Sequence, residues 1–261
     1  MPRSAVASSQ MTLCNRNQWP LMVGRILPRP FDEPAESTAT DLHRMLAEAT
    51  EALHRQGTKA LVLPAGTIRA DLLPTLWQLV RWIGDQCGQR GIDLLLAGDI
   101  VHGEDWAPLR PLRESFVFGF SKGQWRIPGL PRIEAPHRIR AHHLRGRVML
   151  LGDRPVCAIL GTELFAKGLR EAVAALEVDA LVVLSHHAPT RRWNTVLRML
   201  ADSAPTVVVS ATRRPCAFDH QGRSWEQTPV VHLPDLAIDS LKLSTDDPSE
   251  SRLRSDVCSG V

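Results

Sequence analysis

Short runs of apolar residues, separated by segments with helical periodicity, constrain the fold of this chain more than any other feature. The runs Lys59 to Leu63, Ile92 to Ala97 and Asp179 to Leu184 are almost uninterrupted. Continuous runs of this kind are typical of strands that are covered on both faces. Between them, apolar residues recur at helical spacing, as in Leu42 to Leu53 and Leu73 to Ile83. The pattern predicts helices packed outside buried strands.

Antiparallel hairpins interrupt this alternation in the middle of the chain. The segment from Ser115 to Ile127 bends at Ser121-Lys122-Gly123, and the segment from Arg147 to Leu160 bends at Gly152-Asp153. Glycine suits such turns because it adopts positive φ angles at little cost. We expect further helices over residues 163–176 and 193–201, and a last hairpin over residues 217–225. Together these elements predict an α/β fold with two mixed sheets face to face, a four-layer α-β-β-α sandwich.

The length of the chain favours one large domain. With 261 residues, 44% of them hydrophobic, it can bury a sizeable core. We expect a flexible N-terminal lead over residues 1–20 and a single domain over residues 21–243. A tail over residues 244–261 is rich in Ser and Asp and is expected to be disordered.

The composition argues against several classes of protein. The formal net charge is only +3, and the basic run from Arg138 to Arg147 has no interleaved aromatic residues, so nucleic-acid binding is not expected. No stretch approaches the roughly 18 apolar residues of a membrane span, and residues 1–20 lack the apolar core of a signal peptide. The five cysteines form no Cys-x-x-Cys pair, which is typical of free thiols in a reducing compartment. We expect a cytoplasmic protein without a cofactor and without a membrane partner.

Local motifs occur along the chain in an order that a known family shares. They are Leu61-Val62-Leu63-Pro64-Ala65-Gly66, Ile159-Leu160-Gly161-Thr162-Glu163, Ala180-Leu181-Val182-Val183-Leu184-Ser185 and Phe218-Asp219-His220-Gln221-Gly222. With the strands and helices around them, from about Leu21 to Leu233, they resemble the nitrilase (carbon-nitrogen hydrolase) superfamily. The resemblance implies the four-layer sandwich of these hydrolases. It also implies a homodimer that pairs through the helices flanking the active-site strand.

The side chains that the family uses for catalysis are missing at the matching positions. Family members use a Glu as general base, a Lys that stabilises negative charge, and a Cys that attacks a nitrile or amide carbon. Here the Glu position falls on Ala65 and the Cys position on Gly161. The Lys position falls in a Lys-free loop, where Arg126 or Arg132 supplies positive charge; the prolines up to Pro136 allow this alignment to shift. The resemblance therefore implies a pseudoenzyme that acts by ligand binding or assembly.

The same resemblance places a candidate pocket at the ends of successive strands. Its expected residues are Ala65, Gly66, Gly161, Thr162, Glu163, His186 and His187. Such a pocket implies a small-molecule ligand and no metal. Cys157 precedes Gly161 within the same apolar strand, so we expect a buried structural thiol rather than a displaced nucleophile.

Two alternative functions remain open at this stage. The first is an active hydrolase of amides, nitriles or acyl groups whose catalytic set has moved to other positions. The second is a metallophosphoesterase-like hydrolase, because Asp99, His102 and His186 follow buried strands and could hold metal ions. The segments Gly152-Asp153-Arg154 and Val209 to Arg213 lack the further Asn and His ligands that such an enzyme needs.

Overall fold

Two β-sheets face each other in the computed structural model of the chain, which describes residues 21–26, 39–102, 112–133, 138–186, 190–204, 206–211, 216–219, 225–232 and 236–243. The first sheet has the order β11-β12-β1-β2-β3-β4-β5 and the second has the order β10-β9-β8-β7-β6. The strands of the first sheet are β1 (Leu21–Ile26), β2 (Ala60–Ala70), β3 (Asp93–His102), β4 (Leu112–Ser121), β5 (Gln124–Pro131), β11 (Trp225–His232) and β12 (Leu236–Leu243). Those of the second are β6 (Val148–Leu151), β7 (Arg154–Leu160), β8 (Ala180–Ser185), β9 (Thr206–Ala211) and β10 (Cys216–Asp219).

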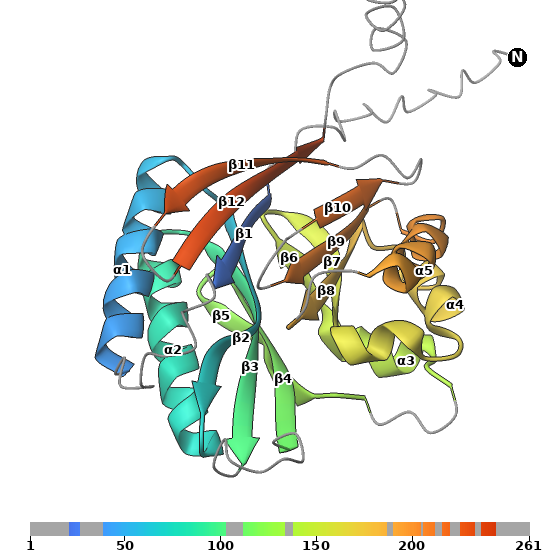
Figure 1. The fold of residues 1–261 in the computed structure, drawn as a ribbon, viewed down its shortest axis with the longest axis horizontal. Helices are drawn as coiled ribbons and strands as arrows, with labels where there is room; N and C mark the ends of the chain where they lie inside the picture. Colours follow the sequence, from blue (N-terminus) through green and yellow to red (C-terminus); the bar gives the residue numbers. More distant parts are fainter. Residues whose placement is uncertain are drawn as a thin grey trace, which may run out of the picture.

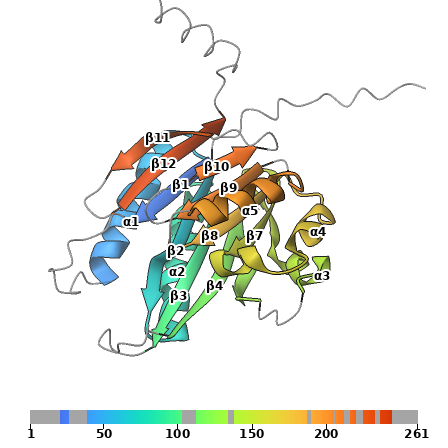
Figure 2. The same cartoon turned by 45° about the vertical axis from the view of Figure 1, so that its right-hand side comes forward.

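Helices cover the outer face of each sheet (Figure 1). The helices α1 (Ala39–Arg55) and α2 (Leu73–Gln89) lie on the first sheet. The helices α3 (Ala141–Leu144), α4 (Leu169–Ala174) and α5 (Arg191–Ala201) lie beside the second sheet, with the 3-10 helices η1 (Arg145–Arg147) and η2 (Gly161–Phe165) (Figure 2). No helix among the described residues is long and apolar enough to cross a membrane.

Buried side chains form three separate layers, which confirms the predicted α-β-β-α sandwich. On β8, Val182 and Leu184 pack between the two sheets, whereas Leu181 and Val183 pack against the helices of the second sheet. A third cluster, which includes Leu63 and Ile83, lies between the first sheet and its helices. Strands with apolar side chains on both faces are required because each sheet has a neighbour on each side.

The strand β2 continues past the point where the sequence predicts its end. The predicted apolar run ends at Leu63, just before Pro64-Ala65-Gly66, but the pairing with β3 resumes after a bulge, passing from Leu63 to Ile68. Inside the bulge Gly66 has a φ of 88°, which glycine adopts without strain, and the Thr67 hydroxyl donates to the Pro64 carbonyl at 2.8 Å. The bulge thus interrupts the hydrogen bonds between β2 and β3, but the strand continues beyond it.

Two further predictions of elements are wrong. The helix expected over residues 163–176 is divided into η2 and α4 by a break at Gly168, where φ is 77°. The last hairpin, expected over residues 217–225, does not form, because β10 pairs with β9 in the second sheet and β11 pairs with β12 in the first. The strand β12, which was not predicted, lies between β11 and β1. The expected lead (1–20) and tail (244–261) lie outside the described residues.

One carboxylate ties hairpin turns of both sheets together. Asp93, at the start of β3, accepts a hydrogen bond from the backbone N–H of Lys122 at 3.1 Å. Its other oxygen accepts one from the backbone N–H of Gly152 at 2.9 Å. Lys122 lies in the turn between β4 and β5, and Gly152 lies in the turn between β6 and β7. Asp93 therefore links the two sheets at one end of the sandwich.

Replacing Asp93 by Asn is expected to lower the free energy of unfolding by about 1–3 kcal/mol, because an amide nitrogen cannot accept the second backbone hydrogen bond. Asp153→Asn is the matched control, since its carboxylate is 81% exposed and pairs with Lys122 at the surface. Urea unfolding of the two variants measures the difference. Equal midpoints would contradict the role assigned to Asp93.

Candidate functional site

A row of polar side chains crosses three neighbouring strands of the first sheet. Arg69 on β2 is the register partner of Asp99 on β3, which is also the partner of Ser115 on β4. Register partners project to the same face of a sheet. Ala97 and Val117, two residues before Asp99 and after Ser115, pack between the sheets, so the row faces the second sheet. The Ser115 hydroxyl donates to Asp99 Oδ1 at 2.6 Å.

His186 completes this row from the opposite sheet. It follows β8 directly, and its Nε2 lies 2.8 Å from Asp99 Oδ2. Asp99 is fully buried, which opposes ionisation, but the hydrogen bond and charge of His186, the Ser115 hydroxyl and the charge of Arg69 outweigh burial and hold the pKa of Asp99 below its usual range. An ionised carboxylate only accepts, so Nε2 of His186 carries the proton of this hydrogen bond.

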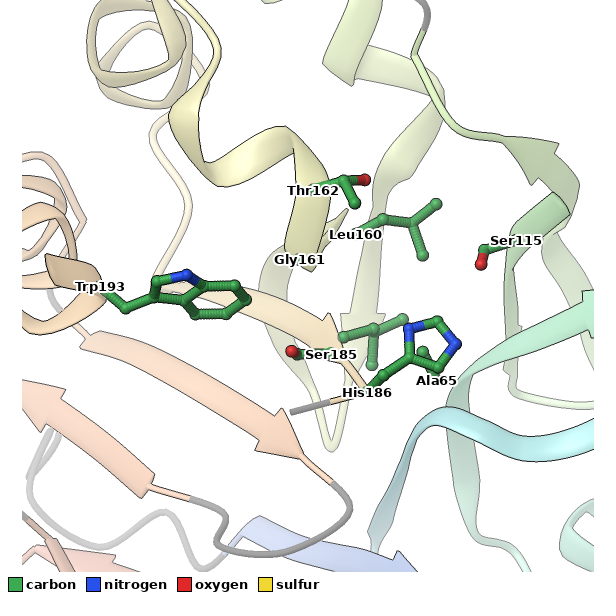
Figure 3. A pocket seen from close by; sticks show the side chains of 9 residues that line it. Ala65, Ser115, Leu160, Gly161, Thr162, Ser185, His186 and Trp193 are labelled. Atoms are coloured by element: carbon green, nitrogen blue, oxygen red, sulfur yellow. The ribbon is translucent and has the colours of Figure 1, made fainter. Parts of the chain in front are cut away.

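A small cavity of about 90 Å³ lies beside the His186–Asp99 pair (Figure 3). Its lining residues come from the β2 bulge, β4, the end of β7, η2, β8 and α5: Ala65, Ser115, Leu160, Gly161, Thr162, Leu184, Ser185, His186 and Trp193. The sequence-predicted residues Ala65, Gly161, Thr162 and His186 are thus brought together. Gly66 borders them, because a Cβ built on it would lie 3.3 Å from His186 Cδ2. His187 lies outside the described residues.

The space next to Gly161 is occupied by side chains from α5 and β8. A Cβ at this position would lie 2.9 Å from Trp193 Cη2 and 3.0 Å from Ser185 Oγ. Figure 3 shows Ser185 on the side of Trp193 and the His186 ring on the side of Ala65. Neither Trp193 nor Ser185 was expected in the pocket. The strand alternation of β8 was the available signal, since it places Ser185 toward the helices and His186 between the sheets.

Glu163 was expected in the pocket but belongs to a buried ion pair outside the cavity lining. Its carboxylate lies 2.6 Å from Arg147 Nη1, and both side chains are 1% exposed. Glu163 also accepts hydrogen bonds from the backbone N–H groups of Ile133 at 2.5 Å and Leu160 at 2.9 Å. Arg147 donates in turn to the Pro131 carbonyl. This set of contacts is called the Arg147–Glu163 clasp below.

The clasp occupies the region where the family's Lys was sought. Arg126 and Arg132 are exposed and do not line the cavity. Arg147, which the sequence analysis named only as part of a basic run, donates to the carbonyl of Pro131, the last residue of β5. Cys157 packs on the helix side of β7, and burial raises the pKa of its thiol to about 12. This agrees with the structural thiol that was expected there.

The metal-site alternative is met only in part by the described side chains. Asp99 and His186 are in contact, as that alternative requires. Within the described ranges, no group of three or more His, Cys, Asp and Glu side chains is arranged to hold a metal ion. The side chain of His102 lies outside the described part of the chain.

Comparison with known proteins identifies the fold. No protein-family model and no curated protein sequence matches the chain. An amidase of the nitrilase superfamily from Nesterenkonia AN1 is structurally similar, with a TM-score of 0.54 and 12% identity over 90% of this chain and 97% of that one. A structure of a mutant of this amidase, with a TM-score of 0.54 and 12% identity over 92% of this chain and 98% of that one, shows the acetamide moiety of fluoroacetamide covalently added at the active-site cysteine.

Two proteins from other organisms give the same result. Nit3 from Saccharomyces cerevisiae, a member of the nitrilase superfamily, has a TM-score of 0.54 and 12% identity over 94% of this chain and 97% of its own. A carbon-nitrogen hydrolase from Helicobacter pylori G27 has a TM-score of 0.54 and 8% identity over 92% and 95%. The chain therefore has the fold of the nitrilase superfamily.

Adding a methyl group at Gly161 is expected to destabilise the protein by about 1–3 kcal/mol, because the new Cβ would press on Trp193 and Ser185. Gly146→Ala is the control, since the nearest atom to its added Cβ lies 3.3 Å away at the end of the Leu130 side chain. Thermal and urea unfolding compare the two. A Gly161→Ala protein as stable as the control would show that this space is open.

Replacing Glu163 by Gln is expected to lower the free energy of unfolding by about 3–5 kcal/mol, because it leaves the Arg147 guanidinium buried without a counter-charge. Adding Arg147→Met to Glu163→Gln should recover part of this loss. Glu171→Gln, which breaks the exposed pair with Arg138, is the control and should change the unfolding free energy by less than about 1 kcal/mol. If Glu163→Gln lowers the free energy of unfolding no more than Glu171→Gln does, the stabilising role of the clasp is contradicted.

Proposed function

We propose that this chain is a nitrilase-fold pseudoenzyme that lacks the Glu-Lys-Cys chemistry and works by binding a small ligand, or by assembly. The observation that carries the proposal is the surroundings of Gly161. This residue matches the nucleophile position, has no side chain, and has Trp193 and Ser185 within 3.0 Å of the place where a Cβ would be. Loss of a catalytic nucleophile alone costs about six orders of magnitude in rate.

The remaining cavity supports ligand binding. An engineered cavity of about 150 Å³ binds benzene, so about 90 Å³ suits a ligand of roughly four non-hydrogen atoms. The walls combine apolar groups, such as Leu160 and Leu184, with the hydroxyl groups of Ser115 and Thr162 and the imidazole of His186. Mixed walls of this kind fix the orientation of a ligand as well as enclosing it.

The active-hydrolase alternative is favoured by one observation, the His186–Asp99 hydrogen bond, because a carboxylate commonly orients a catalytic histidine. A nucleophile must also be placed against the imidazole. Ser115 donates to Asp99 instead, and Ser185 lies toward Trp193 (Figure 3). These two serines therefore do not complete a Ser-His-Asp arrangement, and the pseudoenzyme is the better-supported function.

Turnover measurements separate the two functions. Purified protein is incubated with panels of short amides, nitriles and acyl esters, with and without iodoacetamide, beside the His186→Gln variant. We expect no turnover above the buffer rate in any arm. Turnover that iodoacetamide abolishes would contradict the proposal and reveal a catalytic thiol. Turnover that resists iodoacetamide but is lost in His186→Gln would establish the relocated hydrolase.

The metal and oligomer alternatives need separate readouts. Stoichiometric manganese, iron or zinc in protein purified without chelators would favour the phosphoesterase-like alternative with Asp99, His102 and His186.

The homodimer stays a prediction that light scattering of the purified protein can test. Exposed Phe165 and Met199, at 42% and 51%, lie on η2 and α5, the side on which the resemblance predicts pairing.

A further inference from the structure

We propose that the cavity takes a compact, uncharged molecule whose body is apolar, and that it discriminates against ions and against ligands rich in hydrogen-bonding groups. This inference rests on the proposed ligand-binding function and names its ligand class. It follows from the inner wall of the cavity, from the partners of its polar atoms and from the charges around it.

The inner wall of the cavity is part of the hydrophobic core. Ala65, Leu160 and Leu184 are at most 2% exposed, and all three belong to the apolar cluster between the two sheets. The indole ring of Trp193 adds an aromatic surface from α5 (Figure 3). Removing the apolar body of a ligand from water against these walls is favourable in proportion to the area that is buried.

Polar atoms of the lining already have partners within the protein. The Ser115 hydroxyl and Nε2 of His186 both donate to the carboxylate of Asp99. Ser185 likewise has an interaction partner. A ligand with many donors and acceptors must displace these contacts or leave its own polar groups unpaired, and both cost free energy in a buried site. Thr162 has the exposed side chain of the lining, so a single polar group of the ligand can stay near water there.

The charges around the cavity do not favour an ion. No Asp, Glu, Lys or Arg among the described residues lines it. Asp99 contacts two of the lining residues without lining the cavity itself, and Glu163 is engaged by Arg147. An anion or a cation would therefore enter without an opposite charge in the walls, and an uncompensated charge is costly when it is buried.

The size of the cavity sets the scale of the ligand. About 90 Å³ suits roughly four non-hydrogen atoms, as argued above. The free energy that each atom of a ligand can contribute is limited, so so small a molecule binds weakly, with a dissociation constant in the millimolar range. Selectivity between molecules of equal size is therefore the property to measure.

The test compares probes that all have four non-hydrogen atoms. Acetone and 2-propanol have apolar bodies, urea has two amide nitrogens in place of the methyl groups of acetone, and acetate and guanidinium are ions. Titration of the full chain, with labelled leucine methyl groups observed by NMR, reports binding at Leu160 and Leu184. We expect saturable shifts with acetone and 2-propanol, and acetone should bind about fifteenfold more tightly than urea, since each buried methyl group contributes roughly fourfold. Acetate and guanidinium should give no saturable shift.

Two variants separate apolar contact from hydrogen bonding. Ala65→Val fills part of the cavity and should weaken acetone binding at least fivefold, whereas the exposed Ala174→Val on α4 is the matched control and should leave it unchanged. Thr162→Val removes a hydroxyl without changing the shape of the side chain. Because this exposed hydroxyl exchanges water for ligand, its loss should change acetone binding by less than about threefold. The same spectra show whether each variant is folded.

Several results would overturn the inference. Urea, acetate or guanidinium that binds at Leu160 and Leu184 as tightly as acetone would do so while leaving the proposed ligand binding in place. Loss of acetone binding in Thr162→Val, or unchanged binding in a folded Ala65→Val, would do the same. Absence of a saturable shift with both acetone and 2-propanol would also overturn it. The proposed pseudoenzyme fails separately, through turnover.

Discussion

The Arg147–Glu163 clasp is the interaction on which the site depends most. A buried carboxylate and a buried guanidinium are stable together only if their remaining hydrogen-bonding capacity is also satisfied. Here this is achieved by the backbone of Pro131, Ile133 and Leu160. The clasp thereby joins the end of β5, the helix η1 and the turn from β7 into η2. Those are the segments in which the family resemblance places the Lys and the Cys, so the geometry of the site is maintained by groups that need no role in catalysis.

The second link across the site is the contact between the two sheets at Asp99 and His186. It joins β3 to the end of β8, beside the cavity. The region between Ala65 and Gly161 has two parts. Trp193 and Ser185 fill the part beside Gly161, and the small cavity beside the Asp99–His186 contact is the open part. Space near Gly161 is taken up by the protein's own side chains, and the open part is lined mainly by apolar groups, with hydroxyl groups and an imidazole among them.

The layered fold could be predicted from the sequence because its strands carry apolar residues on both faces, which only a structure with several layers can cover. The approach of Ala65 to Gly161 was also predictable, since the family resemblance places both in one pocket, and both line the cavity. The bulge in β2 was not, because Pro64 and Gly66 signal a stop locally while the pairing with β3 extends beyond them. Asp239 and Lys242 interrupt the apolar pattern of β12, so its place between β11 and β1 depends on long-range pairing. The contacts of Arg147 and of His186 likewise join elements that are far apart along the chain, and spacing alone does not reveal them.

Fluoroacetamide labelling is the most direct test of the central claim, that a nitrilase-fold site persists here without a nucleophile. In a mutant of the Nesterenkonia amidase the acetamide moiety of this compound adds covalently at the active-site cysteine. Peptide mapping by mass spectrometry after incubation of this protein with fluoroacetamide should show no acetamide adduct on any residue that lines the cavity or on Cys157. A stoichiometric adduct within residues 157–163 or 184–193 would contradict the claim, because it would show that an attacking group is present in the site.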